Sequence, residues 1–108
     1  MTRHVNAFEA TLEPYDLEPS EVVAGEPATS ELSVTTTGGV EVGIWQITPG
    51  TVTDVEKDEV FVVLAGEGTI RFADGEVVDL APGSLVRLHA GEATTWEIRS
   101  TLRKVYVV

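Results

Sequence analysis

From residue 31 onward, apolar and polar residues alternate in short segments rich in valine, threonine, isoleucine and aromatic residues. Glycine, proline and Asp-Gly pairs interrupt these segments about every 8 to 12 residues, as turns do between strands. No segment keeps a helical period for about ten residues. About eight short strands bury their apolar faces most economically in a barrel or a two-sheet sandwich, so an all-β fold is predicted. The expected strands are 32–36, 40–48, 59–64, 68–72, 76–80, 85–88, 94–99 and 103–108.

The first 30 residues have a different pattern. They contain three prolines and scattered acidic residues, and no alternating or helical period is sustained there. We therefore expect an N-terminal arm over residues 1–30, extended and with one short edge strand near residues 21–24, followed by a single barrel over residues 31–108. The arm is acidic, which is typical of a solvated segment; an interaction tail is the alternative.

Composition narrows the functional classes. The 108 residues carry 18 acidic and seven basic side chains, for a net charge of −11, and such a charge disfavours nucleic acid and anionic membranes as partners. No apolar run approaches the roughly 18 to 20 residues that cross a bilayer. The absence of cysteine excludes disulfides and thiolate chemistry. The N-terminal residues contain no apolar signal segment, and a cytoplasmic protein is expected.

Two spaced motifs carry a resemblance to a known superfamily. Glu59 is followed after six residues by Gly66, and Gly83 is followed by His89-Ala90-Gly91, Thr94 and Ile98 at fixed intervals. In order and spacing, these residues resemble the two signatures of the cupin superfamily. The segments GIWQITPG, TTWEI and RKVYVV resemble, more narrowly, the cupins related to ureidoglycine aminohydrolase. The resemblance implies a small cupin-type barrel, also called a jelly roll or double-stranded β-helix.

The resemblance also locates a metal site whose ligands are missing. The family places a pair of histidines two residues apart, a glutamate and a third histidine inside the barrel. Here the paired positions correspond to Thr53 and Val55, or to 52 and 54, the third histidine position is Thr94, and only Glu59 is kept. One carboxylate and a hydroxyl are too few donors for a transition metal, so no metal or other cofactor is expected. The acidic run 56–59 is read as a solvated loop, with a Ca²⁺ or Mg²⁺ site as the alternative.

A pocket can still be predicted from the alternation of side chains. Residues that share the Glu59 side of their strands line the barrel if the cupin register holds. Glu59 is then buried without a cation, which would raise its pKa and suit it to general acid or base catalysis. A structural hydrogen bond that closes the barrel is the alternative role. With Glu59 as the catalytic candidate, the predicted pocket residues are Thr53, Val55, Phe61, Val86, Leu88, Thr94 and Trp96.

The remaining candidates have two interpretations each. Trp45 is read as a core residue, while Trp96 is equally suited to the core or to a ligand platform. The cations of the C-terminal half, at positions 87, 99, 103 and 104, are read as surface partners of Glu97 or Asp79, with a ligand-binding arginine at the barrel mouth as the alternative.

Two functions are expected. The first, which the resemblance implies, is a metal-independent protein that binds or transforms a small polar metabolite, with nitrogenous compounds among the candidates; whether it is an enzyme is left open. The second is a non-catalytic module that forms a homodimer through an exposed sheet face, with the arm adding a strand to its neighbour. The apolar side of strand 60–64 and the residues Val105 and Val107 are expected to need such cover.

Overall fold

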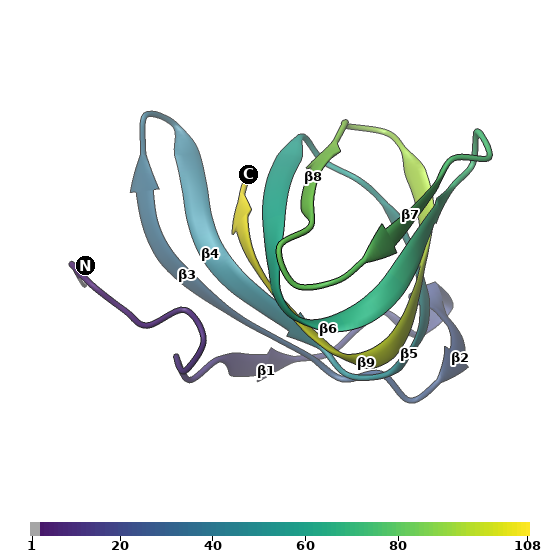
Figure 1. Cartoon of the computed structure of the whole chain (residues 1–108), viewed down its shortest axis with the longest axis horizontal. Coiled ribbons are helices and arrows are strands. Elements are labelled where there is room, and N and C mark those ends of the chain that lie inside the picture. The colour runs from purple at the N-terminus through teal and green to yellow at the C-terminus, as the bar shows by residue number, and fades with distance from the viewer. Residues whose placement is uncertain (1–2) are drawn as a thin grey trace.

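The computed structural model describes residues 3–108, which form one curled antiparallel sheet (Figure 1). The prediction of an all-β cupin-type fold is confirmed. The strands are β1 (Glu13–Tyr15), β2 (Val22–Gly25), β3 (Thr29–Thr37), β4 (Val40–Ile47), β5 (Gly50–Val55), β6 (Glu59–Phe72), β7 (Val77–Leu80), β8 (Leu85–Leu88) and β9 (Ala93–Val107), and a single 3₁₀ turn, η1, covers Pro19–Glu21. No helix in the described part of the chain is long and apolar enough to cross a bilayer.

Two long strands organise the sheet. Strand β9 pairs along one edge with β4 and β5 and along the other with β6, which also pairs with β7 and β8. The ladder between β6 and β9 is irregular near Val63, Ala65 and Glu67. Extra residues of this kind bend a strand and increase its twist, so one pair of strands can serve both halves of the curled sheet.

The sequence pattern predicted each of these strands as two, with breaks at residues 65–67 and 100–102, but β6 and β9 continue through both points. A glycine at a bulge and a glycine at a turn look alike in a sequence, because both provide a backbone conformation that other residues rarely adopt. Strand β5, over residues 50–55, was not among the expected strands.

The core lies inside the curl. Alternate residues of β6, β8 and β9 point inward, as a pleated strand requires, and pack together. The largest fully buried side chains include Phe61, Ile47, Ile70, Leu88 and Leu102. The same alternation places Lys104 and Tyr106 inside, since they follow Leu102 at intervals of two on β9.

The N-terminal segment pairs with both ends of the sheet. Strand β1 pairs with β3, and β2 pairs with β5 at the opposite end of the strand order. The residues between β1 and β2 therefore cross from one side of the curled sheet to the other, below the sheet in the view of Figure 1. Farther upstream, the Arg103 guanidinium donates hydrogen bonds to the carbonyl groups of Ala7, Phe8 and Ala10 and fixes this part of the segment against β9.

Candidate functional site

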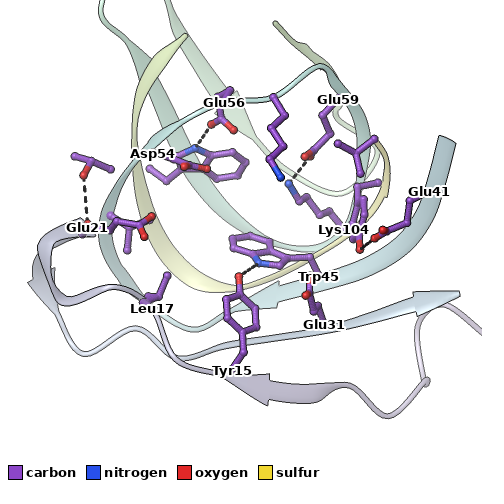
Figure 2. Close-up of a pocket in the computed structure, with 16 residues that line it drawn as sticks. Tyr15, Leu17, Glu21, Glu31, Glu41, Trp45, Asp54, Glu56, Glu59 and Lys104 are labelled. Atoms are coloured by element: carbon purple, nitrogen blue, oxygen red, sulfur yellow. Dashed lines mark hydrogen bonds and ion pairs between the residues drawn. The ribbon is translucent and has the colours of Figure 1, made fainter. Parts of the chain in front are cut away.

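A cavity of about 400 Å³ opens between the curled sheet and the N-terminal segment (Figure 2). Four aromatic side chains and six carboxylates contribute to its wall. The aromatic residues are Tyr15, Trp45, Trp96 and Tyr106; the carboxylates are Glu21, Glu31, Glu41, Asp54, Glu56 and Glu59. Lys57 and Lys104 are its two basic residues. A wall with this excess of acidic groups favours cations and neutral hydrogen-bond donors over anions.

The Lys104 ammonium group lies at the centre of the site. Its Nζ is 2.6 Å from Glu59 Oε2, and both side chains are largely buried. The same nitrogen lies 4.3 Å from the ring centroid of Phe61, 4.8 Å from that of Trp45 and 5.0 Å from that of Trp96. Aromatic faces attract a cation at these distances, and a carboxylate neutralises it. The ammonium is therefore stabilised in an interior position that the alternation of β9 imposes.

This ion pair corrects the expected environment of Glu59. From the sequence, Glu59 was expected to lie in the barrel without a cation and Lys104 to lie at the surface, and both expectations are wrong. The two residues are 45 positions apart in the sequence, and a sheet register was needed to bring them together. The expected surface pair is instead formed by Arg71 and Glu97, at 2.7 Å.

The buried carboxyl group with a perturbed pKa is Glu56. Its Oε2 accepts hydrogen bonds from Thr94 Oγ1 at 2.7 Å and from Trp96 Nε1 at 3.1 Å. Glu56 lies between β5 and β6, where its own N–H donates to the Glu92 carbonyl and its carbonyl accepts from the Gly91 N–H. Burial raises the pKa of the Glu56 carboxyl above its usual value, and the hydrogen bond from Thr94 offsets part of that rise.

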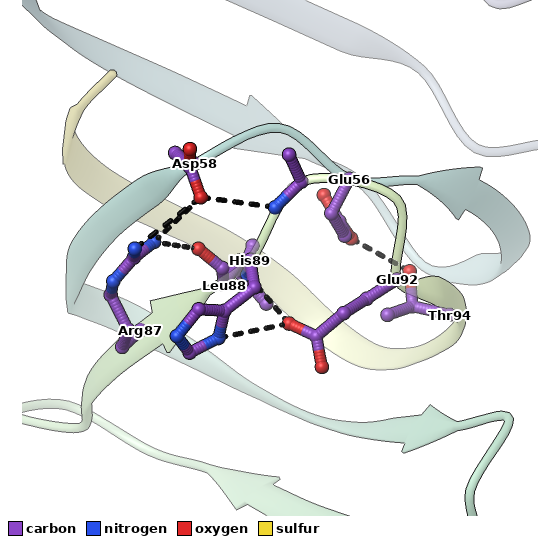
Figure 3. A network of polar contacts seen from close by, with 8 residues as sticks. Glu56, Asp58, Arg87, Leu88, His89, Glu92 and Thr94 are labelled. Carbon is purple, nitrogen blue, oxygen red and sulfur yellow. Dashed lines mark hydrogen bonds and ion pairs between the residues drawn. The ribbon is translucent and has the colours of Figure 1, made fainter.

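From the sequence, Glu56 was expected to belong to a solvated acidic loop. In fact the three acids of that loop have different partners. Glu56 binds Thr94, and Asp58 binds Arg87 and the Ala90 N–H (Figure 3). Glu59 binds Lys104, as Figure 2 shows. The hydrogen bond from Ala90 lowers the pKa of Asp58. In residues 3–108, no group of three or more histidine, cysteine or acidic side chains is arranged to hold a metal ion. A Ca²⁺ or Mg²⁺ site in this loop therefore has no support in the geometry.

Two tyrosines complete the cavity wall. The Tyr106 hydroxyl donates a hydrogen bond of 2.7 Å to Glu41 Oε1, and burial, followed by this carboxylate, raises its pKa. The Trp45 indole N–H donates to the Tyr15 hydroxyl at 2.7 Å, and burial raises the pKa of Tyr15 as well. Both phenols therefore remain protonated at neutral pH. Trp45, which was read as a core residue, is half-buried and lines the cavity.

The raised pKa of Glu56 makes a testable contribution to stability. A group whose pKa is higher in the folded than in the unfolded state stabilises the fold fully below its unfolded pKa, and this contribution is lost as pH rises through the folded pKa. We therefore expect the melting temperature of Glu56→Gln to rise relative to that of the wild type as pH increases above the usual glutamate pKa of about 4.3. Thermal unfolding at a series of pH values measures the difference.

The matched control for this experiment is Glu76→Gln, which changes an exposed carboxylate in the turn between β6 and β7. Its melting temperature should follow that of the wild type across the series. If Glu56→Gln also follows the wild type, the Glu56 carboxyl titrates as it would in water and its assigned environment is incorrect.

A family model described as the EutQ-like cupin domain matches residues 34–106, which is most of the chain. The chain belongs to the EutQ-like cupin family. This assignment confirms the cupin superfamily that the two motifs predicted. Comparison with curated proteins gives no match.

Solved structures agree with this cupin assignment. A protein of unknown function from the DUF861 family of Pseudomonas syringae pv. tomato has a TM-score of 0.80 at 21% identity, covering 91% of this chain and 44% of that one. A structure of unknown function from Rhizobium leguminosarum has a TM-score of 0.66 at 27% identity, covering 73% and 78%. The EutQ protein of Clostridium difficile has a TM-score of 0.65 at 18% identity, covering 86% and 79%. The chain thus spans less than half of the Pseudomonas protein.

The positions of the cupin metal ligands do not form a metal site here. Glu59, the one acidic residue kept at these positions, is bound to Lys104, and Thr94 is bound to Glu56. Thr53 lines the cavity and Val55 is 68% exposed. A transition metal needs several nitrogen or carboxylate donors directed at one point, so the residues present do not fit one.

The predicted pocket residues fall into three groups. Glu59, Thr53 and Trp96 line the cavity, and Thr94 is buried where it can bind Glu56. Val55 lies at the surface on the other side of β5 from Val52, where it and Thr94 border a second, shallower depression. The remaining three are core residues that do not border the cavity: Phe61, Val86 and Leu88.

Proposed function

We propose that this EutQ-like cupin binds or chemically transforms a small polar metabolite in the 400 Å³ cavity without a metal ion. The observation that carries the proposal is the Lys104–Glu59 pair beneath three aromatic rings. A charge inside a protein is costly to desolvate, and replacing such a pair by apolar residues is often neutral or stabilising. The presence of a buried ion pair at this position is therefore better explained by a role in ligand binding than by a contribution to the stability of the fold.

The wall of the cavity indicates the class of ligand. Six carboxylates against two lysines favour a molecule that offers N–H or O–H donors, and the faces of Trp45 and Trp96 suit a planar group. The likeness to cupins related to ureidoglycine aminohydrolase supports nitrogenous compounds as the first candidates. Hydrolysis of ureidoglycine by a bound metal is not part of the proposal, because the ligand positions do not fit a metal.

Both tryptophans line the cavity, so indole fluorescence reports its occupation directly. We expect at least one compound in a panel of ureides, amino acids and small carboxylates to raise the melting temperature and to change this fluorescence with saturation. Glu31→Gln removes one exposed carboxylate from the wall and should weaken a nitrogenous ligand about two- to fivefold. Glu67→Gln, an exposed carboxylate that is not part of the cavity wall, is the control.

Two results would contradict this proposal. The first is a panel in which no compound raises the melting temperature or changes the fluorescence. The second is stoichiometric manganese, iron, nickel or zinc in the purified protein, because the proposed site has no place for such an ion.

A homodimer is a second proposal, compatible with the first. Leu85, Val62 and Val105 lie in register on three neighbouring strands, and Val60 and Val107 form a parallel row beside them. Leu85 is 73% exposed, and Val60 and Val107 are each 38% exposed. A second copy of the chain would cover this apolar face. Because β1 and β2 pair within their own chain, the proposal relies on this face rather than on an exchanged strand.

The dimer proposal is tested by sedimentation equilibrium. The wild type should sediment as a dimer, while Leu85→Glu should sediment as a monomer with a folded circular dichroism spectrum. A wild-type monomer at micromolar concentration would contradict the proposal.

A further inference from the structure

Glu56 presents one oxygen to the cavity and uses the other for its hydrogen bonds. Both bonds, from Thr94 and from Trp96, end on Oε2. Within residues 3–108, no hydrogen bond ends on Oε1. Every buried side-chain nitrogen or oxygen in this range has a hydrogen-bond partner, so Oε1 is not a buried atom. Since Glu56 lines the cavity, Oε1 is open to it, as the close-up in Figure 2 allows the reader to follow. The carboxyl group is thus fixed in orientation and has one free acceptor site.

The surroundings suit this oxygen to proton transfer. Glu56, Thr94 and Trp96 are 7%, 4% and 4% exposed, so little water competes for the carboxylate. A carboxylate with few water neighbours is a stronger base than one in bulk solvent. Asp54 and Lys104 are the charged groups whose fields act on it, and they oppose each other. Thr94 Oγ1 in turn accepts a hydrogen bond from Trp96 Nε1 at 3.1 Å, and this bond orients the Thr94 hydroxyl group.

Lys104 supplies the complementary charge. Its Nζ donates one hydrogen bond, to Glu59, and the ammonium carries three N–H groups. It lines the same cavity as Glu56 and is held by three rings and a carboxylate. A fixed ammonium stabilises negative charge that develops on a bound molecule during a reaction.

We propose that Glu56 is the general base of a metal-free proton transfer in this cavity, acting on a small neutral molecule with an acidic C–H beside a carbonyl group. The C–H proton passes to Glu56 Oε1, the electron pair of that bond forms a C=C bond, and the carbonyl oxygen becomes an oxyanion that the Lys104 ammonium stabilises. Return of the proton to the same carbon re-forms the carbonyl group, and addition to the opposite face of that carbon gives racemisation. The cycle needs no oxidant, reductant or metal.

This inference rests on the proposed function, because it requires that the cavity take up a small molecule. It adds the type of reaction and the residue that carries the proton. Its test needs a substrate whose reaction depends only on a base in an apolar site, and the natural metabolite is not required.

The probe is 5-nitrobenzisoxazole, a planar neutral compound. A base removes its single isoxazole C–H proton, the electron pair forms the C≡N bond, and the N–O bond breaks to release a yellow phenolate. We expect the wild-type protein to accelerate this reaction above the buffer rate with saturation in the probe. Glu56→Gln keeps the hydrogen-bond acceptor for Thr94 but removes the base, and should lose at least about 100-fold of the acceleration.

Controls separate the base from a general effect of charge. Glu67→Gln and Glu76→Gln each remove an exposed carboxylate that is not part of the cavity wall; both should retain the rate to within about threefold. Circular dichroism and the melting temperature establish that Glu56→Gln is folded. If the folded variant reacts as fast as the wild type, or if the wild type does not exceed the buffer rate, the inference is wrong.

Quenching of tryptophan fluorescence by the probe distinguishes the two proposals. Saturable quenching without acceleration would overturn the proton transfer and leave small-molecule binding in place. The absence of both quenching and acceleration would overturn the inference and count against the binding proposal as well.

Discussion

Lys104→Met is expected to reduce the free energy of unfolding by about 3 kcal/mol. Methionine fills a similar volume, but the Glu59 carboxylate is then left in a largely buried position without its cation. The three rings around Nζ also lose the charge that they stabilise. Removing one member of a buried pair is costly because the desolvation of the other member is no longer offset. Urea denaturation with both tryptophans as probes measures the change.

Two further variants test whether the loss of unfolding free energy arises from the Lys104–Glu59 ion pair. Lys104→Met combined with Glu59→Gln should recover more than half of the lost free energy, because the unpaired charge is removed. Lys57→Met changes the other, exposed lysine of the cavity and should stay within about 0.5 kcal/mol of the wild type. A loss below about 1 kcal/mol for Lys104→Met would mean that the pair is solvated and weak.

Gly66→Ala is expected to be at least as destabilising, by about 3 to 5 kcal/mol. Gly66 has a φ of +94° in the middle of β6, where an L side chain is strained. A Cβ at this position would also collide with the Thr101 carbonyl oxygen and would lie 2.6 Å from Leu102 Cα. Both neighbours are backbone atoms of β9, so no rotamer change can relieve the contact.

Gly75→Ala separates the two causes. Gly75 has nearly the same φ, +97°, but a Cβ there would meet nothing within 4 Å. Its cost should therefore be the conformational strain alone, about 1 to 2 kcal/mol. The difference between the two unfolding free energies then measures the close approach of β6 and β9. Equal effects for the two variants would show that the strands do not approach as described.

The strands could be predicted from the sequence because the alternation of apolar and polar residues is a local property. Strand β8 was predicted at its observed bounds, and β4 and β7 were predicted to within one residue. The spacing from Glu59 to Gly66 and from Gly83 to Thr94 was enough to identify the superfamily, since residues fixed by turns keep their intervals. The finer likeness to ureidoglycine aminohydrolase remains a proposal.

The chemistry of the cavity was less readable. Glu59 was correctly predicted to lie on the inner side of β6. Its partner, Lys104, lies on β9, and neither local sequence indicates an ion pair between residues 45 positions apart. Glu56 stands in an acidic loop that looks solvated, and only the approach of β9 buries it against Thr94 and Trp96. One signal was available in retrospect. Lys104 lies midway between the core residues Leu102 and Tyr106 at the period of a strand, which places a lysine among inward-facing residues.

By itself, the sequence determined that the chain is all-β, that its strands form a cupin-type fold, and that the histidines of the family's metal site are absent. Period and turn spacing are encoded between near neighbours, so a single chain reveals them. The tertiary structure alone decided which charges meet, which acid is buried and how the N-terminal segment borders the cavity. Pairing and burial depend on registers between distant strands, and each register is fixed by the packing of the whole sheet rather than by any one segment.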